Sequence, residues 1–162
     1  MKYLKEFNDY MRKKYQMDKY PLNELLMELF EKYNKYKYEP YVDLPNVRES
    51  DVIESLEMIE GDGKVITSSS YPRYEEHFDN WILIIFGYRG GLMSKIYYQY
   101  EIKVIDKSSE RTSYGDFVNF KHYDTAAMIF GDNCPKIVDK EVISKVINDF
   151  KEQVFLNNED LF

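Results

Sequence analysis

Residues 81–104 read WILIIFGYRGGLMSKIYYQYEIKV, and this stretch decides the fold. Its first six residues are all apolar, a pattern typical of a strand that is covered on both faces. From Ile96 to Val104 every second residue is apolar or aromatic, which predicts a strand with one buried face. Residues 87–91 include three glycines and predict the turn between the two strands. We therefore expect a β-hairpin at the centre of the chain.

Helices are expected before and after this hairpin in the sequence, because apolar residues in those segments recur at intervals of three and four. The predicted helices cover residues 2–16, 22–35, 50–60 and 139–154. Pro21 stands at the first position of the second helix, and Gly61 and Gly63 end the third. The face of the last helix that we expect in the core is formed by Val142, Ile143, Val146, Ile147, Phe150 and Val154.

The remaining segments predict further strands and loops. We expect strands over residues 64–68 and 117–130, a polar loop over 69–80 and a turn region over 106–116. Helices and strands are then segregated along the chain, which defines an α+β fold. The predicted architecture is a set of N-terminal helices, a three- to four-stranded antiparallel sheet with a central hairpin, and a C-terminal helix.

The length of 162 residues suits a single domain. Within it we distinguish a helical N-terminal part (1–45), an acidic helix with the β-sheet (46–130) and the C-terminal helix (135–156). The one cysteine, Cys134, allows no internal disulfide and is expected to be a structural thiol. The charged N-terminus lacks the apolar segment of a signal peptide, and the apolar run at 81–86 is too short for a membrane span. These features predict a cytoplasmic protein without membrane segments.

The negative charge of the chain is concentrated in one stretch. Residues 42–80 carry ten acidic and three basic groups, so their net charge equals the −7 of the whole chain. Such a field attracts basic surfaces and repels nucleic acid, although an acidic face also serves solubility alone. Sixteen tyrosines accompany it, and Tyr is suited both to cores and to interfaces. The tyrosine excess is also explained by the codon usage of an AT-rich genome, because the chain has 17 Lys and 5 Arg.

From these observations we expect a binding surface around the acidic stretch. Its predicted residues are Tyr38, Tyr41, Glu49, Asp51, Glu54, Glu57, Glu60, Tyr71, Tyr74, Glu75 and Glu76. The expected partner is a basic protein, such as a nuclease or another enzyme that handles nucleic acid. A small acidic chain of this kind suits an inhibitor or immunity-type accessory protein of a phage or mobile element. We expect it to be non-catalytic and to need no cofactor or metal.

One alternative is a regulator that binds DNA. Over residues 20–90, the order of two helices followed by a hairpin at 64–86 is similar to that of winged-helix domains. That resemblance implies that the helix near residues 49–60 reads DNA, but this segment has five acids and no base, so phosphates would repel it. Arg12, Lys13 and Lys14, beside two tyrosines, form the place where nucleic acid could dock.

A second alternative is a metal-dependent enzyme. His77 and His122 each begin a His-aromatic-Asp tripeptide, which ends at Asp79 and Asp124. Residues two apart in a strand share a face, so each pair could point at a metal of the zinc or iron type. Two ordinary polar or partly exposed histidines near strand ends are the simpler explanation of the pattern. The glycines at 61 and 63 lack the frame of a phosphate-binding loop, and no Gly-x-Ser-x-Gly motif is present.

Overall fold

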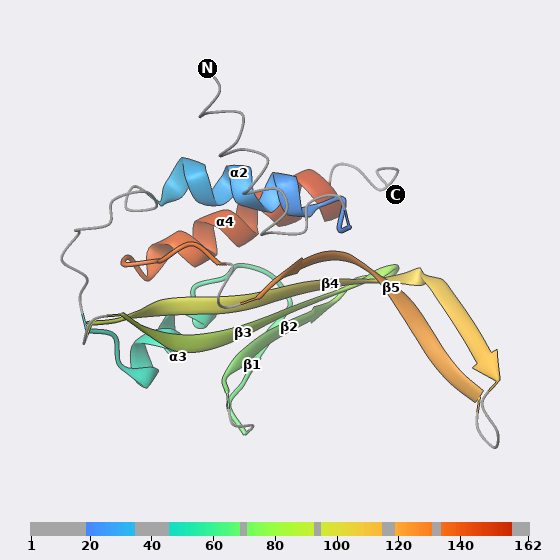
Figure 1. The fold of residues 1–162 in the computed structure, drawn as a ribbon, viewed down its shortest axis with the longest axis horizontal. Helices are drawn as coiled ribbons and strands as arrows, with labels where there is room; N and C mark the ends of the chain where they lie inside the picture. Colours follow the sequence, from blue (N-terminus) through green and yellow to red (C-terminus); the bar gives the residue numbers. More distant parts are fainter. Residues whose placement is uncertain are drawn as a thin grey trace.

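The computed structural model describes residues 19–34, 46–68, 71–92, 95–114, 119–130 and 134–156 (Figure 1). The elements are α2 (Asn23–Tyr33), α3 (Glu49–Glu57), β1 (Lys64–Ile66), β2 (Arg73–His77), β3 (Trp81–Leu92), β4 (Lys95–Tyr114), β5 (Asn119–Ile129), α4 (Glu141–Lys151) and the π-helical turn η2 (Glu152–Leu156). The α+β class is confirmed. The helix expected over residues 2–16 lies outside the described residues. Within the described ranges, no helix has the length and apolarity needed to cross a membrane.

The five strands form one antiparallel sheet in sequence order, β1-β2-β3-β4-β5. The central hairpin is confirmed, since β3 and β4 pair from Trp81 opposite Asp106 to Leu92 opposite Lys95. The expected turn at residues 87–91 is wrong, because these residues lie inside β3. A Cβ atom at Gly87 would collide with the side chain of Val52 in α3. This glycine therefore allows a helix to approach the sheet rather than the chain to reverse.

The sheet has five strands rather than three or four, because β2 lies in the segment 69–80 that we expected to be a loop. The strand reads Arg-Tyr-Glu-Glu-His, and the side chains that it buries are those of Tyr74 and Glu76. A carboxylate on the inward face conceals the alternation by which strands are recognised. The turn region expected at 106–116 is also wrong in large part, since β4 continues to Tyr114.

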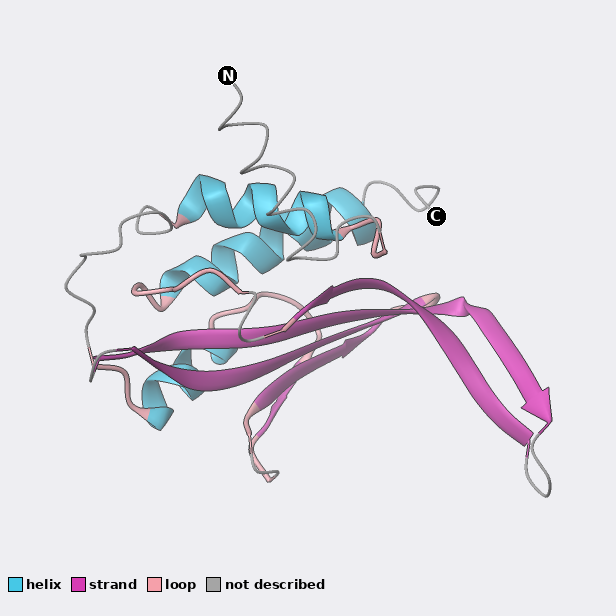
Figure 2. Cartoon of the chain, viewed as in Figure 1, coloured by secondary structure: helices cyan, strands magenta, loops and turns pink. Residues whose placement is uncertain are grey.

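The core lies between one face of the sheet and the helices. Figure 2 shows α2 and α4 side by side above the sheet, and α3 contacts β1, β2, β3 and α4. The six side chains that we expected on the core face of the last helix are all buried, as predicted. From the sheet, Leu83, Ile85, Ile102 and Val104 are fully buried. Ile82, Ile84 and Phe86 on the other face are only half-buried, so 81–86 is not covered equally on both faces as predicted.

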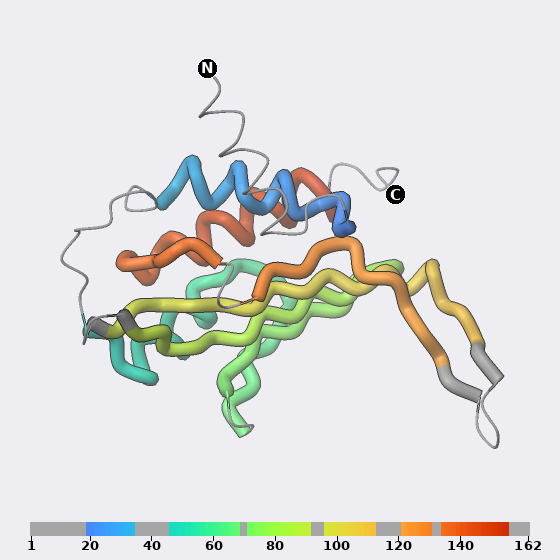
Figure 3. The backbone as a smooth tube through the Cα atoms, viewed as in Figure 1, coloured from blue at the N-terminus to red at the C-terminus, as the bar shows by residue number. Residues whose placement is uncertain are grey.

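Beyond Asp106, the sheet continues as a two-stranded ribbon that projects from the body (Figure 3). We call residues 107–114 and 119–123 the arm. The pairing of β4 with β5 shifts register between Val104 and Ile105 and again between Asp106 and Arg111, and such irregularities bend a strand pair. Within the arm, the Lys121 ammonium lies 3.1 Å from the Glu110 carboxylate. The arm is thus held by cross-strand contacts rather than by the core.

A buried ion pair connects the helices to the sheet. The Lys151 Nζ lies 2.8 Å from the Glu76 Oε1, and the two side chains are only 6% and 5% exposed. Lys151 also donates to the carbonyl oxygen of Glu60, while the Tyr74 hydroxyl donates to the same Glu76 oxygen. Gly61, with φ +137°, packs directly over this cluster, where a Cβ would collide with both charged groups. The cluster therefore joins α4, β2 and the segment after α3.

We predict that Lys151→Met destabilises the fold strongly, because it leaves the Glu76 carboxylate buried without its cation. The expected loss in the free energy of unfolding is about 3–5 kcal/mol, measured by denaturant titration. The double variant Lys151→Met, Glu76→Gln should recover part of this loss, because the buried charge is then removed.

The control is Lys145→Met on the same helix, where the lysine is 56% exposed. It should change stability by no more than about 0.5 kcal/mol. Equal stability of the Lys151→Met variant and the control would contradict a structural role for the buried pair.

Candidate protein-binding surface

Helix α3 presents a row of carboxylates to solvent. Its apolar residues Val52 and Leu56 are 1% and 0% exposed and pack against the sheet. Its outer side carries the exposed carboxylates of Glu49, Glu54 and Glu57. A fourth exposed carboxylate, that of Glu60, follows the helix. We call these four residues the acidic face. The sequence predicted all four as surface residues, and the structure places them on one helix and its continuation.

The acidic residues of α3 favour the helix at its start, where Glu49 and Asp51 lie in the first turn, but not at its end. The negative end of a helix dipole lies at its C-terminus, where acidic side chains are unfavourable. Glu57 is the last residue of α3, Glu60 follows soon after, and the last turn contains no basic residue. Carboxylates at this end therefore contribute nothing to helix stability through the dipole.

Lys140 compensates part of the charge of the acidic face. The Lys140 ammonium lies 2.9 Å from the Glu54 carboxylate, with both side chains substantially exposed. Exposed pairs of this kind contribute about 0–1 kcal/mol and exchange readily with solvent. Asp51 is held more firmly, since the backbone N–H of Arg48 donates to its Oδ2 at 3.0 Å. This hydrogen bond caps the start of α3, and it holds the pKa of Asp51 below its usual value.

A small groove lies at the N-terminal end of the acidic face. Its volume is about 220 Å³, and it is lined by Glu49, Val52, Tyr71, Pro72, Gly87, Tyr88 and Arg89. The ring of Tyr71 is 52% exposed, and its centroid lies 4.5 Å from that of Tyr88. Tyr88 is held in place by a 2.8 Å hydrogen bond from its hydroxyl to Glu101. The groove thus combines one carboxylate, one guanidinium and two aromatic rings.

The groove brings together two predicted residues that are distant in sequence, Glu49 and Tyr71. Sequence reasoning missed Tyr88 and Arg89, which reach the groove because β2 pairs with β3 and the Gly87 N–H donates to the Pro72 carbonyl at 2.9 Å. No local motif marks these residues. Their position in the groove follows from strand pairing alone.

The predicted residues on β2 do not form one surface. Tyr74 and Glu76 point into the core and are 2% and 5% exposed, which corrects their assignment as surface contacts. Glu75 lies on the opposite face, as strand alternation requires. Its carboxylate is 2.6 Å from the His77 Nε2 and 3.1 Å from the Arg73 Nε. The hydrogen bond with His77, followed by that with Arg73, lowers the pKa of Glu75.

Two further predicted contacts, Tyr38 and Tyr41, lie outside the described residues. The same holds for the basic cluster Arg12, Lys13 and Lys14. These assignments stay predictions. The candidate surface is therefore built from α3, the segment after it, and the groove beside Tyr71.

The two His-aromatic-Asp tripeptides lie far apart, which is evidence against a shared metal centre. His77 is in β2 and His122 is in β5, with β3 and β4 between them. Three strand spacings amount to about 14 Å, well beyond the reach of one ion. Asp124 is instead 2.7 Å from the Arg111 guanidinium. Among the described residues, no group of three or more His, Cys, Asp or Glu side chains could hold a metal.

The winged-helix resemblance is wrong for the strands. Residues 64–86 do not form a separate hairpin but contribute to three strands of a larger sheet. The outer side of α3 carries carboxylates where a DNA-reading helix needs cations. The described residues therefore offer no groove-binding helix of this type.

Cys134 is enclosed by the core. Its side chain is 7% exposed, and burial raises the pKa of the thiol to about 12. A nucleophilic cysteine needs the opposite shift, because the thiolate is the reactive form. The geometry agrees with the expected structural thiol.

No protein-family model, curated protein or solved structure matches the chain. The acidic face and the tyrosine-lined groove are therefore the features of the chain that bear on its function. Carboxylates beside exposed aromatic rings suit the binding of cationic groups, with arginine as the best match in a protein partner.

We predict that native Cys134 resists alkylation. At pH 8 almost no thiolate exists in the folded state, whereas the thiol of an unfolded chain has a pKa of about 8.5. Iodoacetamide should add a single mass increment rapidly in denaturant and slowly without it, as followed by intact mass spectrometry. Equal rates in both conditions would show that the thiol is accessible.

We also predict a pH-dependent contribution from Glu75. Because its folded pKa is lower than the unfolded value of 4.5, its stabilising effect is complete above that value and disappears as the pH falls through the folded pKa. The difference in unfolding free energy between wild type and Glu75→Gln should therefore shrink on acidification. Denaturant titrations across this range measure it, and a difference independent of pH would contradict the predicted linkage.

Proposed function

We propose that this chain is a non-catalytic protein-binding module that recognises a basic protein through the acidic face and the adjoining groove. The observation that carries the proposal is the placement of exposed carboxylates at the C-terminal end of α3, where the helix dipole disfavours them. Folding gains nothing from this arrangement, so a binding role supplies the reason for it. A protein partner is favoured over nucleic acid because phosphates would be repelled.

The groove supplies a specific contact for such a partner. An arginine side chain could place its guanidinium against the Glu49 carboxylate and stack on the exposed ring of Tyr71. Pairing with the carboxylate fixes the orientation of the guanidinium. The aromatic face adds a cation–π contribution of about 0.5–1 kcal/mol at exposed sites. The acidic face then contributes mainly to the rate of association by steering.

The proposed partner is a nuclease or another enzyme that handles nucleic acid. Such enzymes bind phosphates with clustered Arg and Lys side chains, and a row of carboxylates can occupy the same cationic surface. The net charge of −7 and the small size support an inhibitor or immunity-type accessory protein of a phage or mobile element. Blocking the partner's surface would then require no catalytic group in this chain.

The test compares two variants with the same change in charge. The first carries Glu49→Gln, Glu57→Gln and Glu60→Gln on the candidate surface. The second carries Glu24→Gln, Glu28→Gln and Glu31→Gln, which are exposed on α2. Proteins captured by the wild type from a lysate of its host are identified by mass spectrometry, and the affinity of the captured partner is then measured for each variant.

We expect the first variant to bind about tenfold more weakly, since three exposed pairs of up to about 1 kcal/mol each are lost. Its affinity should also depend less on salt than that of the wild type. The α2 variant should retain the wild-type affinity. Equal losses in the two variants would show that only net charge matters, and a captured partner without a basic surface would contradict the proposal.

A further inference from the structure

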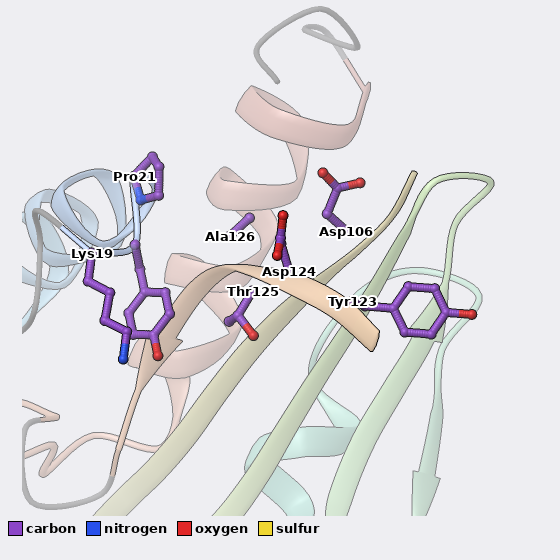
Figure 4. Close-up of a pocket in the computed structure, with 8 residues that line it drawn as sticks. Lys19, Pro21, Asp106, Tyr123, Asp124, Thr125 and Ala126 are labelled. Carbon is purple, nitrogen blue, oxygen red and sulfur yellow. The ribbon is translucent and has the colours of Figure 1, made fainter. Parts of the chain in front are cut away.

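A second and larger pocket lies where the arm leaves the body (Figure 4). Its volume is about 590 Å³, within the range of ligand-binding sites. It is lined by Lys19, Tyr20, Pro21, Asp106, Tyr123, Asp124, Thr125 and Ala126. The pocket therefore opens between the start of α2 and the bend of β4 and β5, and it shares no residue with the acidic face or its groove.

Two carboxylates share this pocket. Asp106 and Asp124 are direct partners in the register of β4 and β5, and Figure 4 shows their side chains on the same side of the sheet. Like charges at directly opposite positions destabilise an antiparallel pair, because the Cβ atoms are only about 5 Å apart. A cation placed between the two carboxylates would remove this repulsion.

Among the described residues, a cationic side chain pairs with one of the two carboxylates. Asp124 lies 2.7 Å from the Arg111 guanidinium. In the described part of the chain, Asp106 accepts hydrogen bonds from the backbone N–H of Ser108 at 2.9 Å and from the hydroxyl of the same serine, which are both neutral donors. Within these ranges, the Asp106 carboxylate is thus hydrogen-bonded by neutral groups and forms no ion pair.

The aromatic wall of the pocket already attracts a cation. The Lys19 ammonium lies 5.3 Å from the centre of the Tyr20 ring, a cation–π distance. Tyr123 also lines the pocket and is 41% exposed, but Figure 4 shows its ring directed away from Lys19 and the two carboxylates. The wall thus offers apolar ring surface beside the two carboxylates, a combination that suits a flat or alkylated cation.

We propose that this pocket binds an organic cation, a guanidinium or alkylammonium group, between the Asp106 and Asp124 carboxylates and the Tyr20 ring. A metal ion fits less well, because Ca²⁺ takes six to eight oxygen ligands and the pocket supplies two carboxylates. The cation could belong to a basic polypeptide or to a free amine. The proposal is independent of the proposed function, since the two sites share no residue.

The test is a titration of the ¹⁵N-labelled full chain with n-butylguanidinium, followed by the amide signals of Tyr20, Thr125 and Ala126. The uncharged ligand n-butylurea has nearly the same shape and serves as the matched control. Asp106→Asn removes the uncompensated charge with little change in volume. Glu110→Gln removes an ion pair in the arm that does not line the pocket. Lys19→Met removes the competing cation.

We expect saturable shifts with n-butylguanidinium in the millimolar range and none with n-butylurea. Asp106→Asn should weaken binding about fivefold, the upper end for an exposed ion pair. Lys19→Met should tighten binding, and Glu110→Gln should leave it unchanged. The variant with Glu49→Gln, Glu57→Gln and Glu60→Gln should bind the probe like the wild type, which separates this result from the test of the acidic face.

The proposal is overturned if these amides show no saturable shift, if n-butylurea binds equally, or if Asp106→Asn binds like the wild type. If Asp106→Asn folds poorly, Lys19→Met provides an independent test. If the Lys19→Met variant binds n-butylguanidinium as the wild type does, or more weakly, that result also counts against the site. A blocked Gly-Arg-Gly peptide distinguishes the two sources of the cation. Tighter binding of the peptide than of n-butylguanidinium points to a polypeptide, and weaker binding points to a free amine.

Discussion

The buried ion pair between Lys151 and Glu76 determines how the helices sit on the sheet. A buried charge without a partner is costly, so any packing that separates these two groups is disfavoured. The Glu60 carbonyl and the Tyr74 hydroxyl complete the hydrogen bonding of the cluster, and Gly61 leaves room for it. The position of α4 is thereby linked to the end of α3. The direction in which the acidic face points follows from that link.

The sheet explains why the two candidate sites are separate. Among the described elements, α3 contacts β1, β2 and β3, and α2 contacts β5, while the pairing of β4 with β3 ends at Asp106. The groove beside Tyr71 forms at the end of β3 that α3 covers, and the pocket beside Asp106 forms where the layer of helices ends. Both sites combine carboxylates with tyrosine rings. Each is thus suited to cations, although they are built from different elements.

The candidate site was only partly predictable from the sequence. The sequence predicted Glu49, Glu54, Glu57 and Glu60 on or beside one helix, and the structure shows all four exposed, the first three on α3 and Glu60 after its end. Tyr74 and Glu76 were misplaced, because nothing near Glu76 in the sequence indicates that Lys151, 75 residues later, neutralises it in the core. Tyr88 was missed for a similar reason. It reaches Tyr71 only through the pairing of β2 with β3.

By itself, the sequence determined the α+β class, the central hairpin and the buried face of α4, because periodic apolar residues reflect local geometry. Only the tertiary structure decided that β2 is a strand and that β4 and β5 extend into the arm. It also decided that Gly87 leaves room for the Val52 side chain to pack against the sheet. These features depend on contacts between residues distant in the chain. A buried carboxylate or a glycine in a strand is stable only when its distant partner is in place, and local sequence patterns do not contain that partner.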